Sequence, residues 1–245
     1  MQQLKAEIRL GTSLSKDDVA AMYDLYAVYF ENSSREIFEE DLAEKDYVVV
    51  LLDEHRNTQG FSTLAILEFE FAGRGMRALF SGDTIISNPY WGTFALPEAW
   101  CRLAGQIKAE RPDEPLYWLL ISKGYRTYRY LPLFSKTYYP ACETPTPPEI
   151  QDLMDFLGRF KFGDAYDAAS GLVRFPQSRG QLRGSWGDVK EEARCKPEVT
   201  FFLERNPNYR NGEELVCLTE LVEENLRSVA LRSFRQGARE KVAVL

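Results

Sequence analysis

Asp83 is a carboxylate within an otherwise apolar stretch that runs from Ala78 to Ile86. Gly82 precedes it, and a glycine within a strand often marks a bulge. A carboxyl group at such a bend would be partly desolvated, which raises its pKa toward the range of a general base. In the alternative interpretation, Asp83 is structural and accepts backbone N–H bonds at the bulge. The residues alone leave both open.

Further chemistry is offered by basic and phenolic side chains in the middle of the chain. Lys123, Arg126 and Arg129 form the densest basic group and could contact a phosphate. Tyr128 and Tyr130 alternate with them and are either proton donors or core aromatics.

Cysteine and histidine chemistry is disfavoured by the spacing of these residues. Zinc sites usually draw on closely spaced Cys and His pairs, so we expect no metal. A nucleophilic cysteine normally needs a histidine partner, and the single His55 lies in a charged turn where we expect it to be exposed and dispensable. The four cysteines, expected to be small buried hydrophobes, are Cys101, Cys142, Cys195 and Cys217.

Periodicity predicts the elements that position these residues. The first half opens with a strand and two helices, followed by a three-stranded meander, a helix, a buried strand and an aromatic-rich helix that Pro132 kinks or splits. The strands are expected over 4–10, 46–52, 61–71, 76–87 and 116–121. The helices are expected after Ser13, after Ser33, over about 94–109 and over 124–139.

A proline-rich segment, 143–148, divides the chain into a core of residues 1–142 and an extension of residues 143–245. We expect the extension to complete the sheet and cover the site. Its predicted elements are a helix over 150–160, a long loop or lid over 163–197, a strand over 198–204, a buried run over 215–218 and a helix over 221–234.

This element order resembles the GNAT N-acyltransferase superfamily over roughly residues 1–140, as a divergent member. The resemblance implies an α/β (α+β) fold with a mixed, mostly antiparallel central sheet flanked by helices. It also implies a V-shaped splay between the third meander strand and the buried strand, where an acyl thioester binds. The loop before the next helix would wrap the pyrophosphate with backbone N–H groups and the helix N-terminus.

The equivalent loop is Ser87 to Ala95, with Gly92 at the head of the helix. The family pattern has Gln or Arg, two residues, Gly, one residue, then Gly or Ala; this sequence has Pro89 and Phe94 at the outer positions. In the alternative interpretation the loop is a plain turn whose aromatics cap the sheet. The resemblance implies thioester contacts from Ile85, Ser87, Tyr90, Trp91, Gly92, Thr93, Lys123 and Arg126.

The family's proton donor, a tyrosine in the helix after the buried strand, aligns with Phe134, which cannot donate a proton. Tyr128 or Tyr130 would replace it as the acid. Asp83 would be the base that takes a proton from an attacking amine.

The resemblance predicts an acyltransferase that moves an acyl group from acyl-CoA, or from an acyl-phosphopantetheine on an acyl carrier protein, to an amine or hydroxyl of a small molecule or peptide. The alternative is a catalytically inactive GNAT-like module that binds an acyl carrier, a peptide or a protein. A net charge of −7 argues against nucleic acid as a partner. No apolar run is long enough to cross a bilayer. The N-terminal residues lack signal-peptide character, so a cytoplasmic location is expected.

Overall fold

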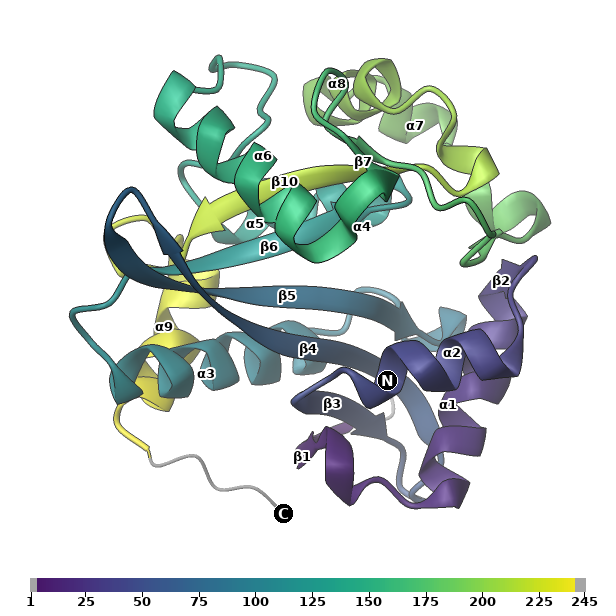
Figure 1. Cartoon of the computed structure of the whole chain (residues 1–245). Coiled ribbons are helices and arrows are strands. Elements are labelled where there is room, and N and C mark those ends of the chain that lie inside the picture. The colour runs from purple at the N-terminus through teal and green to yellow at the C-terminus, as the bar shows by residue number, and fades with distance from the viewer. Residues whose placement is uncertain (1–3, 241–245) are drawn as a thin grey trace.

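A computed structural model describes residues 4–240 of the chain (Figure 1). Within that part, eight strands form one sheet in the order β1–β3–β4–β5–β6–β10–β8–β7, and β2 pairs with β9 separately. The strands are β1 (Lys5–Leu10), β2 (Phe30–Glu31), β3 (Tyr47–Leu52), β4 (Thr58–Phe71), β5 (Arg74–Ile86), β6 (Leu116–Ser122), β7 (Tyr166–Asp167), β8 (Leu172–Val173), β9 (Gln181–Leu182) and β10 (Glu214–Glu220).

Helices cover both faces of this sheet, as predicted. α3 and α9 pack on one face, and α1, α2 and α6 pack on the other. No helix among residues 4–240 is both long and apolar enough to cross a membrane. The helices are α1 (Lys16–Tyr29), α2 (Arg35–Ala43), α3 (Ala95–Glu110), α4 (Tyr125–Tyr128), α5 (Tyr130–Phe134), α6 (Pro148–Phe162), α7 (Glu191–Arg194), α8 (Pro197–Arg205) and α9 (Ser228–Ala238).

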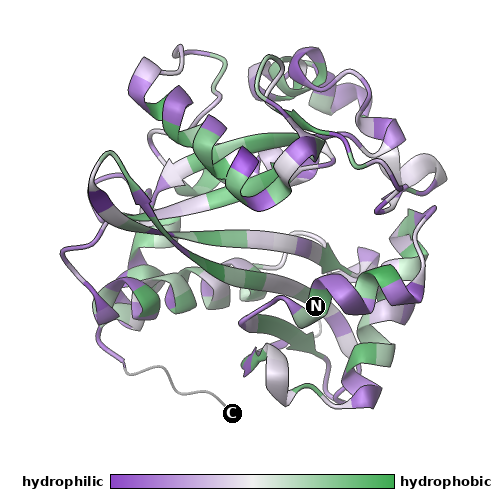
Figure 2. Cartoon of the chain, in the orientation of Figure 1, coloured by the Kyte–Doolittle hydropathy of each residue, from purple (hydrophilic) through white to green (hydrophobic). Residues whose placement is uncertain are grey.

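Alternation along β3 decides which helices each residue contacts. Val49 and Leu51 belong to the core beneath α3, whereas Val48 and Val50 belong to the core beneath α1 and α2. All four side chains are buried. Figure 2 shows hydrophobic residues concentrated along the central strands and on the sides of the helices that face them.

Serine caps fix the start of the two helices that lie over the site. The side chain of Ser15 accepts a hydrogen bond from the backbone N–H of Asp18, and the Asp18 carboxylate accepts one from the N–H of Ser15. This reciprocal pair is a capping box. Ser34 caps α2 by accepting from the N–H of Ile37.

β5 and β6 form the one parallel pair among the described strands, and they separate after Ser81, which pairs with Leu120. Figure 1 shows them close together at one end and apart at the other. On the opposite edge of β5, the interval from Ser81 to Thr84 matches the shorter interval from Leu64 to Ser62 on β4. One extra residue therefore lies in β5, which is the bulge predicted around Gly82.

A side chain at Gly82 would force two neighbouring side chains to move. A Cβ atom on it would lie 2.5 Å from Thr63 Oγ1 and 2.8 Å from Lys45 Cε. After the bulge, Asp83 and Ile85 return to the face of the sheet that Phe80 occupies, on the side of α1, α2 and α6.

Pro132 splits the helix expected over 124–139, as predicted, because it has no N–H to bond to the preceding turn. The two parts, α4 and α5, meet at Arg129, and α5 ends at Phe134 rather than at Tyr139. A second prediction is wrong. The strand expected over 198–204 is helix α8, whose buried residues Val199 and Phe202 lie three positions apart. A proline at the first position suits the start of this helix.

Candidate active site

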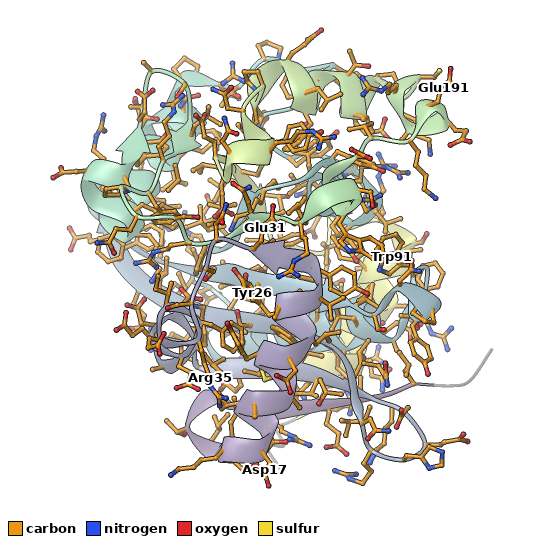
Figure 3. All side chains as sticks on the ribbon, turned by 90° about the vertical axis from the view of Figure 1, so that its right-hand side faces the viewer. Asp17, Tyr26, Glu31, Arg35, Trp91 and Glu191 are labelled. Atoms are coloured by element: carbon orange, nitrogen blue, oxygen red, sulfur yellow. The ribbon has the colours of Figure 1, made fainter. Side chains whose placement is uncertain are left out.

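Two adjoining cavities open where β5 and β6 separate. The acidic cavity, of about 420 Å³, is lined by Asp41, Asp83 and Glu214 among others. The tryptophan cavity, of about 390 Å³, is lined by Trp91 and Trp186 among others. Figure 3 looks toward this open end and labels Tyr26, which lines the acidic cavity, on α1, with Trp91 to its right. Four residues line both cavities, namely Phe30, Thr84, Lys123 and Thr127.

Asp83 projects from the bulge into the acidic cavity. Enclosure by protein raises the pKa of its carboxyl group to about 7; the negative charge of Asp41 acts in the same direction, and the cations of Lys123 and Lys45 act against it. Among residues 4–240, no group donates a hydrogen bond to Asp83. The carboxylate is therefore available to accept a proton near neutral pH.

Three other carboxylates that line this cavity, Asp41, Glu44 and Glu214, differ from Asp83 because cations pair with them. Lys45 lies 2.7 Å from Asp41, and Lys123 lies 3.3 Å from Glu214. Burial raises the pKa of Glu214, and the nearby Lys123 partly offsets that shift. Two carboxylates that line this cavity have no cation partner among residues 4–240: Asp83, and Asp164, which is exposed at the surface.

Aromatic and cationic side chains build the mouth of the tryptophan cavity. Trp91 and Trp186 pack edge to face at a ring separation of 5.4 Å, and Tyr29 lies 4.9 Å from Trp186. The Arg126 guanidinium stacks 4.9 Å above the Trp91 ring, and its Nη1 donates to the Trp186 carbonyl at 2.8 Å. The C-terminal extension thus contributes a wall of this cavity through Trp186.

The edge of β5 provides backbone groups along the tryptophan cavity. The N–H of Ser87 donates to the Gln59 carbonyl on β4, so the alternation of an antiparallel pair turns the backbone of Ile86 and Thr84 toward β6. Trp91 Nε1 donates to the Ile86 carbonyl at 2.7 Å. This strand edge suits an extended ligand that carries amide groups.

The loop after β5 leads to the N-terminus of α3. Gly92 has a φ of +87°, and a Cβ atom on it would meet open space. The helix begins at Ala95 rather than at Gly92, because Thr93 accepts the N–H of Ala95 and Phe94 is the N-cap. Among the described residues, the N–H groups of Gly92 and Phe94 have no backbone partner.

The mixed, mostly antiparallel sheet and the splay between β5 and β6 are the features that the family resemblance implied, and the bulge is the one that Gly82 predicted. The chain has a GNAT-like fold. No protein-family model and no curated protein matches the sequence.

Solved structures with a similar arrangement include GNAT proteins. A probable N-acyltransferase from Enterococcus faecalis is 16% identical at a TM-score of 0.41, over 55% of this chain and 33% of that one. YhbS from Escherichia coli, a GNAT N-acetyltransferase in complex with CoA, is 12% identical at a TM-score of 0.37, over 50% of this chain and 66% of that one. A GCN5-related N-acetyltransferase from Kribbella flavida is 11% identical at a TM-score of 0.39, over 53% of this chain and 32% of that one. The match spans from about a third to two thirds of these chains, and likeness at this level says nothing of activity.

The two candidate acids of this GNAT-like fold lie in different surroundings. Tyr130 lines the tryptophan cavity, and burial raises the pKa of its hydroxyl. Tyr128 is fully buried, lies outside both cavities, and donates to the Pro140 carbonyl at 2.8 Å. Phe134, which the resemblance aligned with a tyrosine, packs on Trp118 in the core. Tyr130 is therefore the phenol that can reach a ligand.

Of the eight residues predicted to contact a thioester, Ile85, Trp91, Gly92, Lys123 and Arg126 line the tryptophan cavity. The other three lie beside it. The backbone of Ser87 pairs with β4, Tyr90 packs against the core beneath α3, and the Thr93 side chain accepts the N–H of Ala95.

Sequence reasoning missed three residues that shape the site. Glu214 and Lys45 are distant in sequence from Asp83. Each of them lies next to a predicted buried strand, and a charged residue at such a position indicates a buried ion pair. Tyr26 was assigned only to an amphipathic helix, yet its hydroxyl donates to the Arg179 carbonyl across the acidic cavity.

Proposed function

We propose that this chain is an acyltransferase that passes an acyl group from acyl-CoA to an amine. The thioester would bind in the tryptophan cavity and the amine in the acidic cavity. One observation carries the proposal: Asp83 lines one cavity and Tyr130 lines the other, and the two cavities adjoin at Thr84 and Lys123. A base and an acid can therefore act from opposite sides of one reacting carbonyl.

Asp83 and Tyr130 would carry the proton transfers. The Asp83 carboxylate takes a proton from the amine as its nitrogen attacks the carbonyl carbon. A C–N bond forms and the C–S bond breaks, and the Tyr130 hydroxyl donates a proton to the leaving sulfur. Both side chains then return to their starting states by exchange with water.

The tryptophan cavity has features that fit the donor. Beyond Ser81 the edge of β5 is not paired with β6, so the backbone of Thr84 can pair with an amide of an extended pantetheine arm, and Arg126 offers positive charge for a phosphate. The N–H groups of Gly92 and Phe94 are available near the N-terminus of α3. Pro97 at the third position of α3 removes one donor that other sequences would supply there.

The test is turnover by the purified full chain with acetyl-, hexanoyl- and palmitoyl-CoA and a panel of amines. Release of the free CoA thiol would be followed by absorbance, and the acylated product by mass spectrometry. Absence of amine-dependent thiol release across the panel would contradict the proposal.

A charge pair at Gly92 tests where the pyrophosphate lies. Gly92→Glu is expected to raise the acetyl-CoA Kd about tenfold or more relative to Gly92→Lys, measured by calorimetry, because a carboxylate would repel the phosphates. Both variants bear the same strain at positive φ, so each controls for the other. Equal affinities would place the pyrophosphate away from this loop.

Phenylalanine substitutions distinguish the two tyrosines. Tyr130→Phe is expected to lower kcat about tenfold or more without loss of stability, since it removes only a proton donor. Tyr128→Phe is expected to lower the free energy of unfolding by about 1 kcal/mol, because it breaks the bond to Pro140, and to leave kcat unchanged. The reverse pattern would assign the acid to Tyr128.

A second candidate function, a GNAT-like binding module, is favoured by one observation. Trp91 Nε1 and Arg126 already bond to the Ile86 and Trp186 carbonyls within the tryptophan cavity. Thioester binding without any thiol release would support this alternative.

A further inference from the structure

We propose that the acceptor is an amine with a single positive charge and an apolar, preferably aromatic, body that carries no carboxylate or phosphate. This inference rests on the proposed function, which assigns the acidic cavity to the acceptor. It follows from which charges in that cavity have partners and from the rings that form its walls.

The cations of the acidic cavity are already neutralised. Lys123 pairs with Glu214 at 3.3 Å and also donates to the Arg179 carbonyl at 3.1 Å. Lys161 lies 2.7 Å from Glu44. Lys45, behind Gly82, pairs with Asp41, which also lies 3.8 Å from Arg179. Every cation at this cavity within residues 4–240 thus has a carboxylate beside it. An acidic group on a ligand would have to displace one of these pairs.

The negative charge of the cavity is concentrated on one available carboxylate. Asp164 is exposed at the surface, where water solvates it, whereas Asp83 lies inside and no cation pairs with it. An ammonium group that binds there gains an ion pair without breaking another. The same carboxylate would then take the proton that the ammonium must lose before its nitrogen can attack. It would pass that proton to water before it accepts the second one, which the nitrogen loses as the C–N bond forms.

The walls around Asp83 are aromatic. Tyr26 stacks on Phe30 at 4.7 Å and tilts against Phe38 at 5.2 Å. On the side of α6, Phe162 packs 5.6 Å from Phe80 and 6.2 Å from Phe175. A cavity of about 420 Å³ bounded by these rings fits a small molecule with an apolar body. The two halves of the proposed ligand thus match the two kinds of lining.

Matched pairs that differ by one carboxylate test this class. Phenethylamine against phenylalanine, and 3-methylbutylamine against leucine, would be titrated into the full chain without thioester, and binding measured by ligand-observed NMR. We expect each amine to bind at least about tenfold more tightly than its amino acid, which corresponds to about 1.4 kcal/mol. Equal or tighter binding of the amino acids would overturn the inference, as would no binding of either amine at about 10 mM.

Two variants extend the test. Asp83→Asn is expected to abolish the preference for phenethylamine, whereas Asp113→Asn, at an exposed turn, is expected to retain it. Glu44→Gln leaves Lys161 without its partner and is expected to improve phenylalanine binding about threefold or more. Glu44 is exposed, so this variant should fold even if a change at Asp83 prevents folding. An unchanged preference in a folded Asp83→Asn protein, or in Glu44→Gln, would contradict the charge argument.

Separate readouts distinguish this inference from the proposed function. Preferential amine binding without thiol release would contradict the transferase activity and support the proposed ligand class. Thiol release driven by phenylalanine and not by phenethylamine would support the transferase activity and contradict the proposed ligand class.

Discussion

Replacing Asp83 with asparagine is expected to lower kcat about a hundredfold or more and to change the acetyl-CoA Kd less than about twofold. The amide cannot accept a proton, whereas thioester contacts come from the other cavity. Wild-type kcat should rise with pH through about 7, where Asp83 ionises. The variant should lose this rise. Initial rates from pH 5.5 to 9 and calorimetry would measure both quantities.

The same substitution should not destabilise the protein above neutral pH. Folding raises the pKa of Asp83 from 3.8 to about 7, so its contribution to stability is full below about pH 4 and is lost as the pH rises through about 7. Asparagine carries no charge to bury. Asp83→Asn should therefore melt at a higher temperature than wild type at pH 8, and this difference should disappear at pH 4.

Two controls accompany this prediction. Asp113→Asn makes the same chemical change at an exposed position, and His55→Ala removes the one histidine, which is exposed at the β3–β4 turn. Both should retain wild-type kcat. A tenfold loss in His55→Ala would point to a histidine mechanism, and parallel losses of stability and activity in Asp83→Asn would indicate a structural role.

Gly105→Ala is expected to destabilise the chain by about 3 kcal/mol, at the upper end for overpacking. α3 and α9 touch through their backbones here: a Cβ atom on Gly105 would lie 2.0 Å from the Phe234 carbonyl oxygen, and one on Gly237 would lie 1.8 Å from the Arg102 carbonyl oxygen. Neither contact can be relieved by a side-chain rotation. For a chain of this size the melting temperature should fall by about 10 °C.

Gly75→Ala is the matched control for this change. The nearest atom to a Cβ atom on Gly75 is a Glu114 carboxylate oxygen at 3.8 Å, which is an ordinary contact. Its melting temperature should stay close to that of wild type. If Gly105→Ala had the same melting temperature as Gly75→Ala, α9 would be able to move away from α3 at little cost in stability.

Local signals predicted most elements of the first half of the chain. The helix after Ser13, the apolar alternation of β1 and the apolar run of β3 each depend on patterns over a few residues, so periodicity and capping residues indicated them. The bulge was predictable because Gly82 and Asp83 interrupt an apolar strand. The resemblance then supplied the splay, which no local pattern encodes.

The extension was harder to predict because long-range contacts decide its structure. Val199, Phe201 and Leu203 alternate like a strand, yet the segment is helix α8 and buries Phe202 against Tyr128 and Tyr209. The helix expected from Leu221 begins at Ser228. The wall that Trp186 contributes depends on Arg183, whose N–H bonds to the Tyr29 carbonyl, a contact between segments far apart in sequence.

The junction of the two cavities at Phe30, Thr84, Lys123 and Thr127 has a consequence for kinetics. Under the proposed function, donor and acceptor would occupy different cavities, so neither has to leave before the other binds. No cysteine lines either cavity in the described part of the chain, so no thiol is placed there to form a covalent acyl-enzyme intermediate. A ternary complex with direct transfer follows, and double-reciprocal plots at several fixed amine concentrations should intersect rather than run parallel.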